Sequence, residues 1–139
     1  MASTQQEIQQ FLESQFPQSL QHCSIISVAE KSAYVRYRID QNHLRPGGTV
    51  SGPTIMAISD FGLYVAILAE LGIVAMAVTS NINIHFLNKP SGERDLVAEA
   101  KLIKIGRTLI VGEVWVYSEG SDEPVAQVTG SYSIPIKSD

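Results

Sequence analysis

Cysteine, charged residues and basic clusters are scarce in this sequence of 139 residues, and each shortage excludes a class of protein. The single cysteine, Cys23, cannot form an internal disulfide, and no Cys/His spacing is typical of a zinc site. We therefore expect a cytoplasmic protein without a metal ion. A net charge of −4 without a run of Lys or Arg argues against a nucleic-acid partner. Residues 1–21 are polar and lack the apolar core of a signal peptide.

Hydrophobic residues, in contrast, make up 45% of the chain, which is enough for one buried core. We expect a single domain over residues 1–139, because this length is too short for two ordinary domains. The longest apolar stretch, residues 53–78, has the length of a membrane span, but it contains Asp60, Glu70 and a turn at Gly72. We expect a core helix here and no membrane partner.

Asp60 is the most informative residue of this stretch. A glycine-rich turn beginning at Gly47 leads into a nearly wholly apolar helix that ends near Leu71, and Asp60 lies in its middle. A helix that is apolar on all sides is buried, and a buried carboxylate must be paired, protonated or used in chemistry, because desolvating a lone charge is costly. No Lys, Arg or His lies within one helical turn of Asp60. Asp60 is therefore a candidate catalytic residue, and a hydrogen bond to Ser59, Tyr64 or the backbone is the structural alternative.

The remaining pattern predicts one further helix and six strands. The first helix begins at Ser3 and Thr4, with Glu7 in the capping-box position, and Pro17 ends it. Consecutive antiparallel strands beside a helix too apolar to face water indicate an α+β fold, in which the sheet wraps around that helix. The strands are expected at residues 23–28, 33–39, 75–87, 96–105, 108–116 and 125–134.

The turn Ser51-Gly52-Pro53, with Asp60 nine residues after Ser51, resembles the hotdog-fold thioesterases of the PaaI type. Their hallmark is a His-Gly-Gly turn that opens the central helix, with a catalytic Asp nine residues after the His. Here Ser51 and Pro53 stand where the family usually has His and the second Gly, and Arg45 stands where many members have Asn. The resemblance covers about residues 34–136 and extends through 78–90, 95–100, 106–107 and 125–134.

This resemblance implies a hotdog fold and the hydrolysis of an acyl-CoA thioester to a free acid and coenzyme A. The backbone N–H of Gly52 would stabilise the oxyanion at the positive end of the helix. Asp60 would act as general base or as nucleophile, and the sequence leaves both open. Thr79 matches a Ser or Thr that orients the attacking water. Ser51 would contact the substrate or cap the helix.

Asp60 lies roughly 10 Å along the helix axis beyond Pro53, at the standard rise per residue. A single carbonyl group cannot contact both points of one helix, so we expect a homodimer whose sites lie between two antiparallel central helices. Pairing of dimers into tetramers remains an open alternative. No cofactor is expected beyond the coenzyme A of the substrate.

Candidate substrate-binding residues are cationic side chains and apolar residues of the expected central helix. Lys101, Lys104 and Arg107 lie close together around Gly106, where cationic donors could hold the phosphates of coenzyme A. An ordinary solvated hairpin is the alternative for these residues. Arg45 is a second candidate for phosphate or carboxylate binding. The acyl group is expected to lie against Ile55, Ile58 and Phe61.

Two other functions stay open at this stage. A non-catalytic acyl-CoA binding protein would account for the changed residues Ser51 and Pro53. A hotdog hydratase or dehydratase would need a histidine and an acid facing one pocket, and His43 with Asp60 could fill these roles. We expect His85 on the surface or at a subunit interface, and His22 and Cys23 carry no functional signal.

Overall fold

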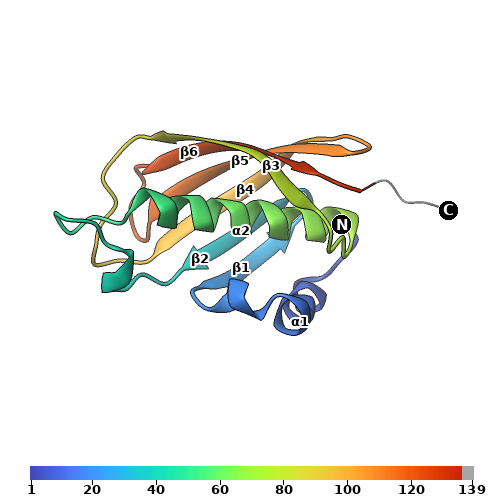
Figure 1. Ribbon diagram of the computed structural model, residues 1–139, viewed down its shortest axis with the longest axis horizontal. Coiled ribbons are helices and arrows are strands. Elements are labelled where there is room, and N and C mark those ends of the chain that lie inside the picture. Colours follow the sequence, from blue (N-terminus) through green and yellow to red (C-terminus); the bar gives the residue numbers. More distant parts are fainter. Residues whose placement is uncertain (136–139) are drawn as a thin grey trace.

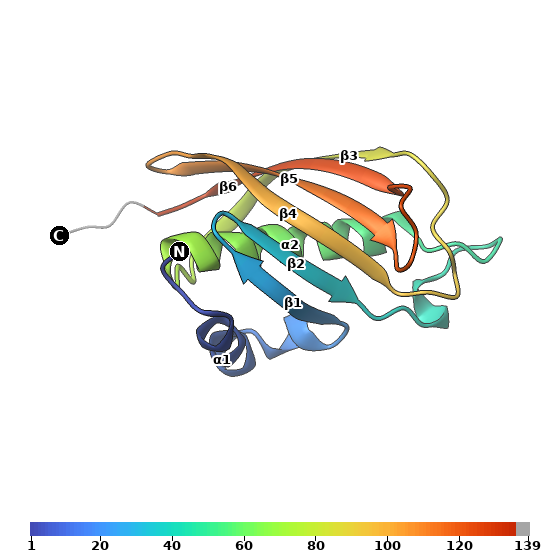
Figure 2. The ribbon, with the colours of Figure 1, turned by 180° about the vertical axis from the view of Figure 1, so that it is seen from behind.

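In a computed structural model that describes residues 1–135, a six-stranded antiparallel sheet wraps around one long central helix (Figure 1). The strand order is β1-β2-β4-β5-β6-β3, and Figure 2 shows these strands from the convex side. Ile136, the last residue of the expected resemblance, and the end of the predicted domain at residue 139 lie outside the described residues. The helices are α1 (Gln5–Gln15), η1 (Pro17–Leu20), η2 (Gln41–His43) and α2 (Gly52–Leu71), and the strands are β1 (Cys23–Ala29), β2 (Ser32–Tyr37), β3 (Val78–Phe86), β4 (Leu96–Ile105), β5 (Leu109–Ser118) and β6 (Ala126–Ser133). The predicted hotdog arrangement is confirmed.

Helix α2 is the core of the molecule. Its length and apolar character would suit a membrane span, but 72% of its most apolar window is buried inside the protein. A Cβ atom on Gly62 would lie 3.3 Å from Ala100 of β4 and 3.3 Å from Val35 of β2, so the missing side chain allows the helix to pack closely on the sheet. The helix is therefore a core helix of this fold.

Helix α1 forms as its sequence predicts. Thr4 and Glu7 make a reciprocal capping box, and the helix ends at Gln15, before Pro17 begins the short helix η1. Ile8 and Leu12 are fully buried, one turn apart, so α1 covers one end of the core (Figure 1).

The predicted first hairpin is also confirmed as β1 and β2. Its turn contains Lys31, which has a positive φ of 58°. The backbone N–H of Lys31 donates a hydrogen bond of 3.0 Å to the carboxylate of Glu70, near the end of α2. The second carboxylate of the apolar helix thus holds the hairpin turn in place.

Strand β3 lies at one edge of the sheet and pairs, within the described residues, with β6 alone. It begins at Val78, three residues later than predicted, because residues 74–77 form a turn closed by Ala77 N–H on the carbonyl of Val74. Val78 and Phe86 are 54% and 60% exposed. An open edge with exposed apolar side chains is a surface suited to pairing with another chain.

Candidate active site

Asp60 lies on the one face of α2 that the sheet leaves open. Pro53, Met56 and Ala57, which share this face at helical spacing, are exposed, and Asp60 is half-buried. The sequence predicted a helix buried on all sides, which is wrong for the N-terminal half of α2. The reason is that the wrapped sheet encloses a helix from one side only, and the fold leaves a strip of apolar surface with one carboxylate.

Two hydroxyl groups from neighbouring strands converge on the Asp60 carboxylate. Thr79 of β3 donates a hydrogen bond of 2.6 Å from Oγ1 to Asp60 Oδ1. The hydroxyl of Tyr132, on β6, contacts the same Oδ1 and lies 3.0 Å from the Asp60 carbonyl oxygen. Within residues 1–135 no side chain donates to Oδ2. The carboxylate is therefore fixed through one oxygen, while the other remains able to accept a proton.

Tyr132 is a residue that the sequence analysis missed. It is 3% exposed, and burial, with the nearby Asp60 charge as a second cause, raises the pKa of its hydroxyl. The phenol consequently keeps its proton and acts as a donor. The register of the β3–β6 strand pair identifies Tyr132, because Tyr132 is the cross-strand partner of Thr79.

The hydrogen-bond partners suggested for a purely structural Asp60 are not its partners. Ser59 donates its hydroxyl proton to the carbonyl of Ile55 at 2.8 Å, and Tyr64 donates to the carbonyl of Ala75 at 3.3 Å. Both hydroxyl groups therefore form their hydrogen bonds with backbone carbonyl oxygens.

The Asp60 carboxylate borders a cavity of about 690 Å³, which also reaches Thr79 and Tyr132. This volume is in the range of small-molecule sites. The walls away from the carboxylate come largely from α1, η1, β1 and β2, which the sequence analysis did not connect with the site. Aromatic rings contribute to the lining from these elements and from α2: Phe11, Phe16, Tyr37, Phe61 and Tyr64.

Of the three residues expected to hold an acyl group, Phe61 alone lines this cavity. Ile55 and Ile58 are 2% and 0% exposed and belong to the hydrophobic core beneath the helix. Their assignment to substrate binding has no geometric support. Cys23 does line the cavity, but burial raises the pKa of its thiol to about 12, so it is a protonated wall residue and not a nucleophile at neutral pH.

The N-terminus of α2 is built from Ser51, Gly52 and Pro53. Ser51 is the N-cap residue of α2, but its hydroxyl pairs with the hydroxyl of Thr54 at 2.9 Å and makes no side-chain capping bond to the backbone. The N–H of Gly52, in the first turn, has no partner within the helix. Gly52 and Asp60 are about 12 Å apart along the axis at the standard rise. One chain therefore does not bring the predicted oxyanion donor to the predicted base.

The predicted phosphate-binding residues lie at two ends of the molecule. Lys104 and Arg107 are exposed near the β4–β5 turn, and a Cβ at Gly106 would lie 2.7 Å from the carbonyl oxygen of Leu109, so this tight turn requires glycine. Gly106 and Arg107 border a second cavity of about 570 Å³ at the C-terminal end of α2. Arg45 is exposed in the loop before α2, at the opposite end of the helix (Figure 1).

The histidines do not support a hydratase. His43 is buried, its Nδ1 accepts a hydrogen bond of 2.9 Å from the backbone N–H of Asp40, and it does not line the Asp60 cavity. His85 is exposed on β3, in line with the expected surface position. The histidine that does line the cavity is His22, which carried no signal in the sequence.

A hotdog sheet around a central helix, with a carboxylate held by two hydroxyl donors beside an apolar cavity, defines the class of hotdog thioester hydrolases. Comparison with known proteins agrees. The sequence profile of the thioesterase superfamily matches residues 47–125, more than half of the chain. A protein of Silicibacter sp. TM1040, provisionally assigned as a thioesterase, has a crystal structure with a TM-score of 0.87 and 44% identity, covering 95% of this chain and 92% of that chain.

More distant relatives point the same way. A protein of Thermoplasma acidophilum, provisionally described as an esterase, is 28% identical over 109 residues, which are 77% of this chain and 79% of that protein. The E. coli PaaI protein from the phenylacetic acid degradation operon shares the fold with a TM-score of 0.81 and 20% identity, over 94% of this chain and 91% of that chain. The chain belongs to the thioesterase superfamily and is a thioester hydrolase.

Proposed function

We propose that the protein is an acyl-CoA thioesterase that works as a homodimer with two equivalent sites. The observation that carries this proposal is the convergence of Thr79 and Tyr132 on one oxygen of Asp60, beside a cavity with an aromatic lining. A carboxylate with one oxygen fixed and the other available is arranged to take a proton from water or to attack a carbonyl carbon.

In the general-base route, Asp60 Oδ2 takes a proton as the water oxygen forms a bond to the thioester carbon. The resulting oxyanion is stabilised by a backbone N–H at the start of α2. Collapse of this intermediate breaks the C–S bond, and the proton held by Asp60 passes to the sulfur of coenzyme A. In the nucleophile route, Asp60 Oδ2 forms an acyl anhydride with loss of the thiolate, and water then hydrolyses that anhydride.

Dimer formation follows from the distance between Gly52 and Asp60 in one chain. The exposed strip of Pro53, Met56 and Ala57 and the open edge of β3 together form an apolar surface next to Asp60. If two chains pair through this surface about a two-fold axis, their α2 helices run antiparallel, and Gly52 of the partner subunit can reach the thioester at Asp60. Tetramers built from such dimers stay a prediction.

The coenzyme A moiety is proposed to lie toward Arg107 and Lys104. Ala75 lines both the Asp60 cavity and the cavity bordered by Gly106 and Arg107, so the two spaces are neighbours across one short segment. A thioester at Asp60 could therefore extend toward cationic side chains. Arg45 lies at the other end of α2 and would contact the same substrate from the partner subunit.

Hydrolysis by this route needs only water and the acyl-CoA substrate, without a separate cofactor. We also propose a cytoplasmic location, which the buried, reduced Cys23 supports.

The test is thiol release from short, medium, long and aromatic acyl-CoAs by the intact protein and by Asp60→Asn, with the oligomeric state measured for both. Turnover that is lost in a dimeric Asp60→Asn protein supports the proposal and identifies the acyl class. Binding of acyl-CoA without turnover in either protein would show a binding module instead, as the changed residues at 51 and 53 would then suggest. Turnover by a monomer would contradict the two-chain site.

A further inference from the structure

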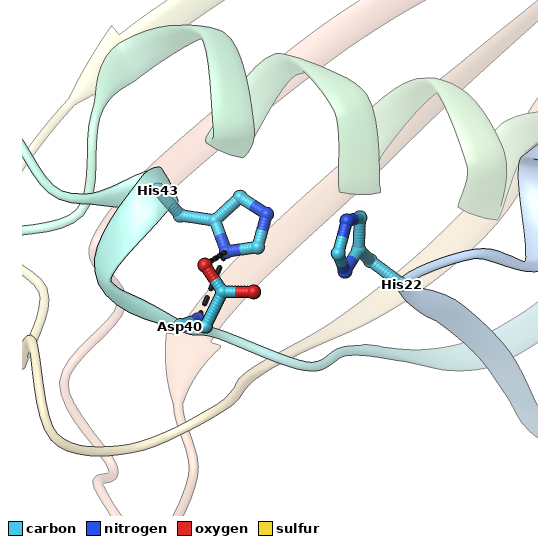
Figure 3. A group of neighbouring side chains, drawn as sticks. All are labelled: His22, Asp40 and His43. Atoms are coloured by element: carbon cyan, nitrogen blue, oxygen red, sulfur yellow. Dashed lines mark hydrogen bonds and ion pairs between the residues drawn. The ribbon is translucent and has the colours of Figure 1, made fainter.

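Three side chains away from the Asp60 carboxylate gather where β1 begins and the loop to α2 turns. They are His22, just before β1, Asp40, the N-cap residue of the short helix η2, and His43, the last residue of that helix (Figure 3). One ligand atom of each residue lies within 4.8 Å of the other two. Imidazole nitrogens and a carboxylate oxygen form the donor set that zinc and related divalent ions prefer.

His43 Nδ1 and Asp40 Oδ1 lie close together without a proton shared between them. His43 Nδ1 accepts a hydrogen bond of 2.9 Å from the backbone N–H of Asp40, so this nitrogen carries a lone pair and no hydrogen. The same Nδ1 lies 3.4 Å from Oδ1 of the Asp40 carboxylate. Each of the two atoms accepts one backbone N–H, from Asp40 and from Asn42, and a cation placed near both would be attracted by both. Ligands of a tetrahedral zinc ion, bound at about 2.0–2.2 Å, are separated by roughly 3.3–3.6 Å.

His22 supplies the independent observation. Its Nδ1 is the one side-chain nitrogen or oxygen atom within the described residues that is buried without a hydrogen-bond partner. Buried polar atoms almost always have a partner, so an orphaned nitrogen needs an explanation. The His22 ring lies at 4.5 Å from the His43 ring, centroid to centroid, and Tyr37 packs against both rings at 5.5 and 4.9 Å. The aromatic packing holds the two imidazoles close together.

We propose that His22, Asp40 and His43 bind one divalent transition-metal ion of the zinc class. The ion would be a partner for the His22 ring, whose Nδ1 is buried without one among residues 1–135, and would bond both to His43 and to the Asp40 carboxylate. The ion would bind the lone pair of His43 Nδ1, which now accepts the backbone N–H of Asp40. This N–H would then need another acceptor or a water molecule. The widest ligand separation must close by about an ångström to reach tetrahedral spacing, so binding requires a small movement of the side chains.

The site would fasten the start of β1 to the loop that leads into α2. Three protein ligands leave a fourth position on a tetrahedral ion. His22 also lines the Asp60 cavity, so the proposed site adjoins the substrate space. The expectation from sequence that the protein holds no metal is revised by this proposal, since His22 and His43 are distant in sequence and meet only in the fold.

The experiment is a titration of untagged, EDTA-treated and dialysed protein with Zn²⁺ by calorimetry, and with Co²⁺ by visible absorption. The expected result is one ion per chain and Co²⁺ bands of a tetrahedral site. His22→Ala and Asp40→Asn should each weaken binding at least tenfold. Asp40 is half-exposed, and Asn can still accept the N–H of Asn42, so this variant should fold even if His22→Ala does not. His85→Ala, at the exposed histidine of β3, is the matched control and should bind as the intact protein does.

Absence of stoichiometric binding would overturn the proposal, as would equal binding by Asp40→Asn, or loss of binding in His85→Ala. The cluster would then be a capped helical turn with aromatic packing. Because these readouts measure the ion and not hydrolysis, their failure is separate from any failure of the proposed thioesterase activity.

Discussion

Helix α2 carries two carboxylates ten residues apart, both half-buried, and the fold uses them differently. Glu70 accepts a backbone N–H from Lys31 and fixes the β1–β2 turn, which is a structural task. Asp60 accepts side-chain hydroxyls from β3 and β6 and borders a cavity. The comparison teaches that the surroundings of a carboxylate, and not its burial or its helix, distinguish a structural acid from a candidate catalytic one.

The largest expected effect comes from exchanging each acid for its amide. Asp60→Asn should lower kcat/KM by about 10³-fold, because the amide cannot take a proton from water or attack a carbonyl. Glu70→Gln should leave activity within about twofold, since an amide oxygen still accepts the Lys31 N–H and that bond is worth only about 1 kcal/mol. Thiol release measures both. Similar losses in the two variants would remove the distinction between them.

Tyr132→Phe should have the next largest effect. The change removes one buried donor from Asp60 Oδ1, and a hydrogen bond to a charged group is worth about 1.5–3 kcal/mol, so kcat should fall roughly 10- to 150-fold. The carboxylate would be less well oriented, while the cavity keeps its shape, and KM should change little. Steady-state kinetics on one acyl-CoA separates these parameters. A rise in KM with an unchanged kcat would assign Tyr132 to substrate binding instead.

Thr79→Val should cost less, about three- to tenfold in kcat, because this position is exposed and water can replace the lost hydroxyl. Thr79→Ser is the matched control, since it keeps the donor and should retain near-normal activity. If Thr79→Ser were as impaired as Thr79→Val, the methyl group and not the hydrogen bond would matter.

The smallest effect concerns stability at alkaline pH. Burial, then the Asp60 charge, raises the pKa of Tyr132, whereas a phenol in an unfolded chain ionises near pH ~10. Above that pH the folded chain binds more protons than the unfolded chain, so the free energy of unfolding falls as pH rises, by up to about 1.4 kcal/mol per pH unit from this group.

Tyr132→Phe removes this contribution, so its stability should fall less steeply between about pH 10 and 11. Urea unfolding at several pH values measures the slope. Burial also raises the pKa values of Tyr37 and Tyr64, and these residues contribute equally to the pH dependence of stability in both proteins. Equal slopes would show that Tyr132 ionises normally.

Much of the architecture was accessible from local pattern. The capping box of α1, the hairpin, the long strands and the apolar central helix all follow from short-range periodicity and turn residues, and all are confirmed. The nine-residue spacing from Ser51 to Asp60 also pointed to the right family. What failed was the orientation of side chains on α2, where Ile55 and Ile58 were assigned to a pocket and lie in the core. A helix that is apolar all round has no periodicity from which to read its open face.

The sequence by itself determined an α+β domain around an apolar helix with Asp60 as a candidate, because these depend on composition, spacing and alternation along one stretch of chain. Its resemblance to the hotdog thioesterases added the class and Thr79. Tertiary structure alone decided that Tyr132 joins them, that α1 and β1 complete the cavity, and that His22 meets His43. Each of these pairs is far apart in sequence, and its meeting depends on strand register and on how the sheet curves around the helix. Those are properties of the packed chain that no local pattern encodes.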